Sequence, residues 1–515
     1  MRQNIYTGEA SNKFHLAEKR RKKMGKYDLV VKNGSLVIPR VGIIRADIGI
    51  LNGKIVSIDS RIEVSQRAET VDASGMYVFP GAIDSHAHIG IFRPLSEDAI
   101  TESISAACGG VTTVCSYFRT GKHYFNKSGR YSDIFPEILE KSSGSYHVDY
   151  AYHLAVMDYQ QLEEVEMLVK HFGVSTFKYY MFYKMLDLTG APATSQYLMT
   201  DSPYDLGFLY EYMKEVARIS KMFESYGRVS LSVHCEQAEI INVATRHAKQ
   251  NPSGNVLKDY SNARPPFSEK LAIKEVEVLA CETGCPVNLL HLSSIDALEA
   301  AEGVTEKHGK DKVLLEVTLH HLGLSYDIPY GKLAKVNPPI RDRKHVEGLW
   351  DALIRNKIDT VVSDSACATQ EIKQGDIWTS LAGFGGIELM FPLLITEGYY
   401  KRGLRLERIA ELLSYNPALY HGLYPKKGTI AIGADADLAI VDLHKEKEVR
   451  VETLHSAQDF TPFEGLKYSG WPVCTILRGK VIFENGQILG TPEDGKYVKR
   501  PVAYHYVNEI AAYSG

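Results

Sequence analysis

The sequence predicts an α/β protein: a (β/α)8 barrel, joined to a small β-sandwich domain formed from both chain ends. Three observations lead to this prediction. Short apolar segments alternate with segments of helical period through the middle of the 515-residue chain. Segments rich in β-forming residues, with glycine turns, occur near each end. Polar and ionisable side chains follow the central strands, where barrels of this kind place their active sites.

The central part of the chain contains eight predicted strands with helical segments between them. The predicted strands are Val78–Ile83, Thr112–Ser116, Asp149–Val156, Ser175–Tyr180, Val229–Val233, Val287–Leu290, Val313–Val317 and Thr360–Val362. Helices are expected, for example, at Leu162–His171, Ser268–Glu282 and His345–Arg355. This alternation argues for parallel pairing through right-handed crossovers, and a TIM-like barrel over residues 78–429 closes such a sheet.

The two ends of the chain share a β-rich composition. The predicted strands there are Tyr27–Val31, Ile43–Ile50 and Lys54–Ile58 near the start, and Leu438–Val441, Val473–Leu477 and Lys480–Phe483 near the end. Hairpin turns are expected at Asn33-Gly34, Asn52-Gly53 and Asn485-Gly486, because Asn-Gly suits a two-residue turn. Residues 27–77 and 430–487 are therefore predicted to form one composite domain.

The terminal segments and the overall composition argue against a nucleic acid or a membrane as the binding partner. Residues 1–26, with the basic run Lys19–Lys23, are expected to be a disordered tail rather than a targeting or nucleic-acid patch, and residues 488–515 an extended tail at an oligomer interface. The formal net charge is −4, which gives no strong field for nucleic acid or membrane. The sequence has no run of 18 apolar residues and no apolar signal core. A cytoplasmic protein with a small-molecule substrate is expected.

A His-x-His pair follows the first central strand. Side chains two residues apart lie on the same side of an extended segment, so His86 and His88 present two imidazoles together. Neutral imidazole suits zinc and similar divalent ions. The pair alone is a weak motif, but it stands at a strand end.

Lys178 is an ionisable residue inside a strand of aromatic and β-forming residues. If its side chain faces the barrel interior, burial and nearby cations lower its pKa and favour the free amine. A free amine can take up carbon dioxide and become a carbamate, which can bridge two cations. The alternative is that Lys178 faces outward and extends its ammonium to solvent. The residues alone leave both readings open.

Three further candidates follow later strands. His234 ends the fifth central strand, His291 follows the sixth, and Asp364 follows the eighth. A single such histidine is more often structural, but two at successive strand ends indicate a site. Asp364 can bind a metal and also move a proton. His320-His321 is expected to pack behind the site rather than to act in it.

Together these motifs resemble the amidohydrolase superfamily, and within it the hydantoinase/dihydropyrimidinase group of cyclic amidohydrolases. The resemblance runs from about residue 27 to about residue 500. Its strongest segments are Gly81–His88, Phe177–Lys184, Val336–Arg341 and Ile432–Leu438. Phe463-Glu464-Gly465 and Gly470-Trp471-Pro472-Val473 are similar to the same group.

The resemblance implies a role for each candidate residue. Lys178 would be N6-carboxylysine bridging two divalent metal ions, zinc being the expected metal and carbon dioxide supplying the carbamate. His86 and His88 would hold the deeper ion with Asp364, and His234 and His291 the outer one. A hydroxide bridging the ions would attack the ring amide. Asp364 would transfer its proton, Tyr183 would stabilise the oxyanion, and the backbone of Asn337 would contact the ring.

The resemblance implies a homotetramer or homodimer that hydrolyses hydantoins or dihydropyrimidines to N-carbamoyl amino acids or ureido acids. Gly90 stands where dihydroorotases carry an arginine, and Tyr183 is a residue that allantoinases generally lack. Asp364-Ser365-Ala366-Cys367 and Leu381-Ala382-Gly383 depart from the usual hydantoinase motifs, and Met185–Ser202 forms a longer loop, a candidate lid. Allantoinase, dihydroorotase and imidase activities stay open as alternatives. A non-catalytic dihydropyrimidinase-related scaffold is a remote one, since such proteins typically lack metal ligands.

Overall fold

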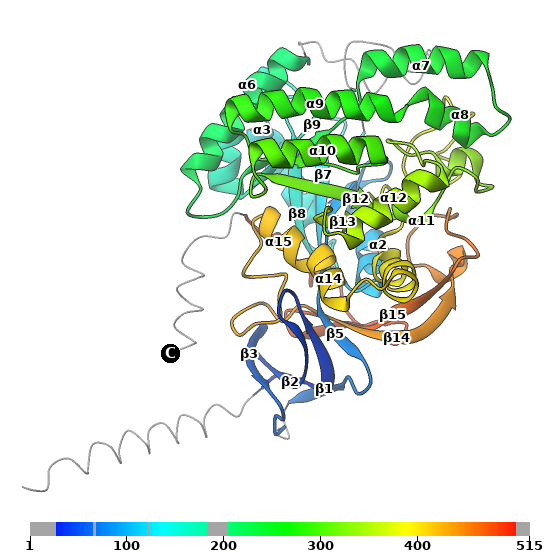
Figure 1. Cartoon of the computed structure of the whole chain (residues 1–515). Coiled ribbons are helices and arrows are strands. Elements are labelled where there is room, and N and C mark those ends of the chain that lie inside the picture. The colour runs from blue at the N-terminus through cyan, green and yellow to red at the C-terminus, as the bar shows by residue number, and fades with distance from the viewer. Residues whose placement is uncertain (1–26, 65–67, 122, 183–203, 501–515) are drawn as a thin grey trace, which may run out of the picture.

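The computed structural model describes residues 27–64, 68–121, 123–182 and 204–500. Within them, hydrogen bonds organise the strands into two sheets, one of eight strands and one of nine. The eight-stranded sheet lies within a layer of helices, and the nine-stranded sheet covers one side of that body (Figure 1). None of the described helices is long and apolar enough to cross a membrane.

The eight-stranded sheet is the predicted barrel. All its paired neighbours run parallel, in the order β13-β12-β11-β10-β9-β8-β7-β6. The strands are β6 (Ala82–Ala87), β7 (Val111–Arg119), β8 (Asp149–Ala155), β9 (Thr176–Tyr180), β10 (Ser230–His234), β11 (Val287–Leu289), β12 (Val313–Thr318) and β13 (Thr360–Val362). Ala87 and Ser365 form a parallel bridge between the first strand and the segment after the last, which closes the barrel.

Helical segments connect the barrel strands. The α-helices are α2 (Leu95–Cys108), α3 (Tyr131–Ser142), α4 (Tyr159–Leu162), α5 (Val165–Met167), α6 (Leu206–Met222), α7 (Ala238–Gln250), α8 (Val256–Ala263), α9 (Pro266–Thr283), α10 (Ile295–His308), α11 (Leu319–Gly323), α12 (Arg343–Ile354), α13 (Met390–Leu393), α14 (Leu406–Ala410) and α15 (Asn416–Tyr420). The π- and 3-10 segments are η1 (Leu168–Phe172), η3 (Gly331–Ala334), η4 (Ile387–Leu389), η5 (Leu394–Tyr400), η6 (Glu411–Tyr415) and η7 (Val451–Thr453).

Several helices begin where a side chain satisfies a free backbone N–H. Asp205, Ser294 and Asp342 accept hydrogen bonds from the third residue of helices α6, α10 and α12, respectively. Such caps stabilise a helix start by about 1 kcal/mol each. The predicted helices Ser268–Glu282 and His345–Arg355 are confirmed, within two residues at each end. The predicted helix at 162–171 is instead a run of short pieces that ends in a π-helix.

The nine-stranded sheet draws on both ends of the chain, as predicted. Its order is β17-β16-β15-β14-β5-β1-β2-β3, with β4 beside β1. The strands are β1 (Leu29–Ile38), β2 (Gly42–Leu51), β3 (Lys54–Asp59), β4 (Glu69–Asp72), β5 (Tyr77–Pro80), β14 (Leu438–Glu448), β15 (Lys467–Leu477), β16 (Lys480–Glu484) and β17 (Gln487–Ile488). They surround a separate apolar cluster that includes Ile48, Leu438 and Ile476.

Two local predictions are corrected. Asn33-Gly34 is not a hairpin turn, since it lies inside β1 at a break in the β1–β2 register. Asn33 adopts a positive φ of 61°, which a β-bulge can require as readily as a turn does. The predicted strand Val78–Ile83 is two strands, divided at Gly81. A Cβ at Gly81 would lie 2.2 Å from Oγ1 of Thr112, so only glycine allows the chain to pass between the sheets.

The C-terminal segment up to Arg500 packs on the barrel of its own chain. The Tyr497 hydroxyl donates to the Phe172 carbonyl oxygen (2.8 Å), and its ring stacks on Tyr152. The predicted oligomer contact at 488–515 stays a prediction, and its last part, residues 501–515, lies outside the described residues. The basic run Lys19–Lys23 lies outside them too. The domain boundaries at residues 77/78 and 429/430 also stay predictions.

Candidate active site

Three of the predicted ligands meet at the seam where the barrel closes. Nε2 of His86, at the end of β6, lies 3.3 Å from Oδ1 of Asp364, and Nε2 of His88 lies 3.2 Å from the same oxygen. Asp364 has a φ of 51°, a left-handed turn just after β13. One donor atom from each of the three residues lies within 4.8 Å of the others, a spacing that a single ion can occupy.

Lys178 points into the barrel beside these residues. It is buried on β9, and its Nζ lies 3.5 Å from Nε2 of His86 and 4.1 Å from the centroid of the Tyr117 ring. The outward-facing alternative is therefore wrong. Burial lowers the pKa of Lys178 to about 8, against the opposing charges of Asp364 and Glu316. The free amine is accessible near neutral pH, as carbamate formation requires.

His234 and His291 complete the group of six. His234 ends β10 and His291 follows β11, with their ring centroids 4.3 Å apart, and the His291 ring is 5.4 Å from that of His86. Burial lowers the pKa of His234 to about 4 and keeps the pKa of His291 and His86 well below the ordinary value. The imidazoles are therefore neutral near pH 7, which is the form that binds metal.

His86 and His88 each use Nδ1 to contact a neighbouring side chain, which leaves Nε2 available to the site. Nδ1 of His86 lies 2.7 Å from the Glu316 carboxylate, and Nδ1 of His88 lies 2.5 Å from the Tyr124 hydroxyl, so both Nε2 atoms face Asp364. The Glu316–His86 contact is a carboxylate–histidine pair, of the kind that fixes the tautomer and orientation of metal ligands. The donor set of imidazoles, carboxylate and lysine therefore fits divalent metal ions.

A buried ion pair orients His234 from behind. Nε2 of His234 lies 2.7 Å from Oε2 of Glu236, leaving Nδ1 available, and Arg264 donates through Nε to Oε1 of Glu236 at 2.9 Å. Burial alone would raise the pKa of Glu236, but Arg264 and His234 bring it down to about 2. Glu236 is thus a fixed carboxylate at the edge of the site.

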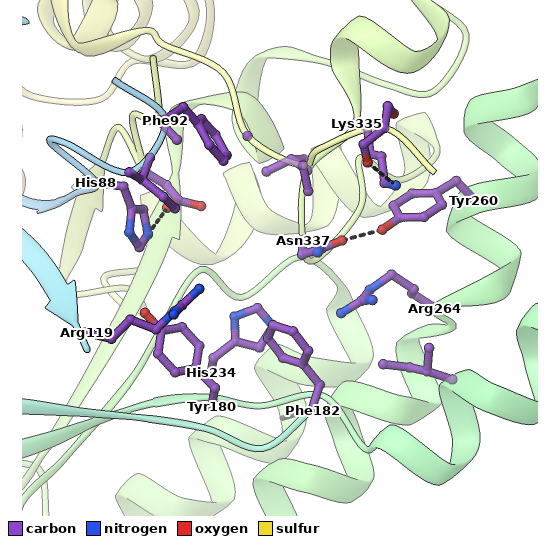
Figure 2. A pocket seen from close by; sticks show the side chains of 18 of the residues that line it. His88, Phe92, Arg119, Tyr180, Phe182, His234, Tyr260, Arg264, Lys335 and Asn337 are labelled. Carbon is purple, nitrogen blue, oxygen red and sulfur yellow. Dashed lines mark hydrogen bonds and ion pairs between the residues drawn. The ribbon is translucent and has the colours of Figure 1, made fainter. Parts of the chain in front are cut away.

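The pocket over this group holds one of the two predicted substrate contacts. His88, His234 and Asp364 line one part of it, and Asn337 lies across from them, its side-chain oxygen accepting from the Tyr260 hydroxyl at 2.6 Å (Figure 2). Aromatic side chains supply much of the remaining wall: Phe92, Tyr124, Tyr180, Phe182 and Trp378. Tyr183 and the candidate lid Met185–Ser202 lie outside the described residues.

The positions that depart from the usual hydantoinase motifs also reach this pocket. Ala366, Ala382 and Gly383 line it, so they form part of the wall that a bound substrate would meet. His320 and His321 are buried behind it, and Nε2 of His321 lies 3.1 Å from the carbonyl oxygen of Pro338. His321 thus supports the segment that carries Asn337.

Sequence reasoning missed several residues of the site. Glu316 stands in the apolar run Val313–Val317, the same signal that singled out Lys178, and could have been found that way. Arg119, Arg264 and Lys335 also line the pocket, but they come from a strand end, a helix end and a loop with no distinctive spacing. Only the folded chain identifies them as pocket residues.

Comparisons with known proteins agree with this geometry. The sequence pattern of the amidohydrolase family matches residues 77–482. The chain is 32% identical over 479 residues to an allantoinase of Rubrobacter xylanophilus (92% of this chain, 98% of the relative). It is also 32% identical over 486 residues to a D-hydantoinase of Geobacillus stearothermophilus (92% and 96%).

Solved structures of similar proteins share the whole fold. An L-hydantoinase (dihydropyrimidinase) from Arthrobacter aurescens superposes with a TM-score of 0.81 at 30% identity, over 92% of this chain and all of the other. A dihydropyrimidinase from Brevibacillus agri superposes with a TM-score of 0.80 at 26% identity, over 92% of this chain and 99% of the other. The barrel, the converging side chains and these likenesses together establish that the chain belongs to the amidohydrolase family, as a cyclic amidohydrolase of the hydantoinase, allantoinase and dihydroorotase group.

Proposed function

We propose that the chain hydrolyses the ring amide of a hydantoin- or dihydropyrimidine-type substrate, giving an N-carbamoyl amino acid or a ureido acid. The observation that carries the proposal is the position of Lys178, a buried lysine within 3.5 Å of His86 in a cluster of neutral imidazoles. Burial makes the charged form of this lysine unfavourable and outweighs the attraction of Asp364 and Glu316. A carbamate on Lys178 would turn an unfavourable buried ammonium into an anionic ligand.

The six residues would hold two divalent ions, zinc being the expected metal. His86, His88 and Asp364 would hold one, His234 and His291 the other, with the Lys178 carbamate shared between them. Such ions polarise an amide carbonyl and lower the pKa of the water that attacks it to near 7.

The chain's own groups would bind the ring and move the proton. Asp364 lines the pocket and lies against both His86 and His88, so its carboxylate can accept the proton of the attacking water and pass it to the departing ring nitrogen. The backbone at Asn337 would hold the ring amide. Tyr183 would donate a hydrogen bond to the developing oxyanion, a contribution typically of about 3 kcal/mol.

Allantoin is the second candidate substrate, since an allantoinase and D- and L-hydantoinases match the chain at 31–32% identity. A panel of hydantoin, 5-substituted hydantoins, dihydrouracil, allantoin and dihydroorotate, offered to the metal-replete protein, tests both. We expect turnover of a hydantoin or dihydropyrimidine. Exclusive turnover of allantoin or dihydroorotate would contradict the proposed substrate, and no turnover of any ring would favour the scaffold alternative.

The Tyr183→Phe variant tests the assigned oxyanion donor. Its kcat should fall by roughly 100-fold or more, with metal content intact. An unchanged kcat would remove Tyr183 from the reaction. The proposal also includes a cytoplasmic homotetramer or homodimer, which light scattering of the purified chain tests; a monomer would contradict the oligomer.

A further inference from the structure

Lys335 is a buried cation in the pocket wall that the hydrolysis reaction does not use. It directly follows η3 and is 5% exposed. Figure 2 shows it beside Tyr260 and Asn337, on the side of the pocket away from His88. It is therefore placed to meet the substituent of a bound ring rather than the ring amide.

The ammonium of Lys335 has only neutral acceptors in the described part of the chain. Nζ donates to the carbonyl oxygens of Trp378 (3.2 Å) and Ser380 (2.6 Å), and it lies 4.9 Å from the centroid of the Tyr260 ring. No described carboxylate forms an ion pair with it. An ammonium has three N–H donors, so one is left for a ligand. Burying a charge without a counter-ion is costly, and an anionic ligand would offset that cost.

Charged neighbours and burial both act on the pKa of Lys335. Arg264 and Lys249 repel its charge and Asp376 attracts it, while burial is the largest influence and lowers its pKa to about 7. Arg264 is already compensated, because Glu236 accepts its hydrogen bonds. The neighbouring Lys373 lies deeper, donates to the Leu333 carbonyl oxygen at 3.0 Å and does not line the pocket. Lys335 is thus the ammonium that a ligand can reach.

We propose that Lys335 binds an anionic group on the ring substituent, so that the preferred substrate is a cyclic amide bearing a carboxylate on a short side arm. This inference rests on the proposed function. Lys335 has an extended backbone, and Asn337, two residues on, also lines the pocket. Residues so spaced are roughly 6–7 Å apart. A ring held at Asn337 therefore reaches Lys335 through a flexible arm, whereas a carboxylate attached directly to the ring does not.

A matched pair of substrates separates charge recognition from shape. The metal-replete full chain is given 5-(2-carboxyethyl)hydantoin and its neutral counterpart 5-(2-carbamoylethyl)hydantoin, and the ratio of their kcat/KM values is measured. We expect the wild type to prefer the carboxylate by about tenfold or more, as a charge-assisted hydrogen bond allows. A ratio near one, or a preference for the amide, would overturn the inference. Hydrolysis of neither compound would instead count against the proposed function.

Variants distinguish binding from a purely structural role, because Lys335 also ties down the segment at Trp378 and Ser380. Lys335→Met should lower the ratio of the two kcat/KM values to about one. Lys335→Arg should retain most of the preference for the carboxylate. Lys332 is the matched control: it donates to the Gly375 carbonyl oxygen at 2.9 Å in the same loop but does not line the pocket, so Lys332→Met should retain the wild-type ratio. A parallel loss on both substrates in Lys335→Met, with the ratio kept, would leave Lys335 a structural residue and refute the proposal.

A binding measurement covers the case in which turnover fails or Lys335→Met does not fold. N-carbamoylglutamate and N-carbamoylglutamine, the products of the two substrates, are titrated into the wild type and Lys335→Arg by calorimetry. The acid should bind about tenfold more tightly than the amide to both proteins. Equal affinities in the wild type would also overturn the proposal.

Discussion

Nδ1 of His86 lies 2.7 Å from Oε1 of Glu316, and both side chains are fully buried in the barrel. The same carboxylate oxygen accepts from the backbone N–H of His291 at 3.1 Å. One glutamate thus orients a side chain from the first barrel strand and the backbone after the sixth. Burial raises the pKa of Glu316 well above its ordinary value, while the charge of Lys178 and the His291 N–H oppose that shift.

Replacing Glu316 should weaken metal binding without removing a ligand. Glu316→Gln keeps the shape but loses the strong acceptor for His86, and partners of this kind contribute about 10–100-fold to metal affinity. Competition with a chromogenic chelator measures the change. Glu277→Gln, a glutamate on the outer helix α9 that pairs with Lys274 and Lys307, is the control and should bind metal as the wild type does. Equal affinity in Glu316→Gln would show that Glu316 plays no part in the metal centre.

Removing Lys178 should empty at least one metal site. Lys178→Ala takes away the proposed bridge between the two proposed sets of histidine ligands, and elemental analysis should show no more than one metal per chain. Intact mass measurement under native conditions should find one added carbon dioxide on the wild type and none on the variant. Lys214→Ala, on the exposed face of α6, is the control. Two metals per chain in Lys178→Ala would contradict the proposed bridging role of Lys178.

Breaking the Glu236–Arg264 pair should destabilise the fold strongly. Arg264→Met leaves Glu236 as a buried carboxylate without its main counter-ion, which typically costs about 3–5 kcal/mol. Urea unfolding of the metal-free protein measures the loss. Arg218→Met, which breaks an exposed pair with Glu166 and Glu215, should cost about 1 kcal/mol or less. Similar costs for the two variants would contradict the assigned burial of the first pair.

The metal-free protein should lose stability as the pH falls below about 6.5. Burial lowers the folded-state pKa of His234 from 6.5 to about 4, so the unfolded chain binds its proton first. The stability associated with neutral His234 is complete above pH 6.5 and is lost as the pH falls towards 4. At pH 5 the loss from this residue is about 2 kcal/mol. The free energy of unfolding in urea should differ less between pH 7 and pH 5 in His234→Gln than in the wild type. An equal difference in the two proteins would refute the assignment.

Much of the fold was predictable because its signals are local. Strand and helix periodicity lie within short windows, so seven of the eight barrel strands were placed to within three residues at each end, and only the first, β6, was displaced. Histidines and aspartate at strand ends meet because parallel strands present those ends at one face. The prediction at Asn33-Gly34 was wrong because a β-bulge and a hairpin turn share the same local composition. The prediction at residues 162–171 was wrong because a continuous helix and an interrupted one also share theirs.

The sequence by itself determined the barrel, the composite β domain and which six residues stand in or just after the barrel strands. Tertiary structure alone decided that Lys178 faces inward, that Glu316 supports His86, and that Arg264 and Lys335 reach the pocket from distant segments. The physical reason is that orientation, burial and pKa depend on neighbours brought together by folding. Local periodicity fixes where a side chain stands along a strand, but only the closed barrel fixes what it faces.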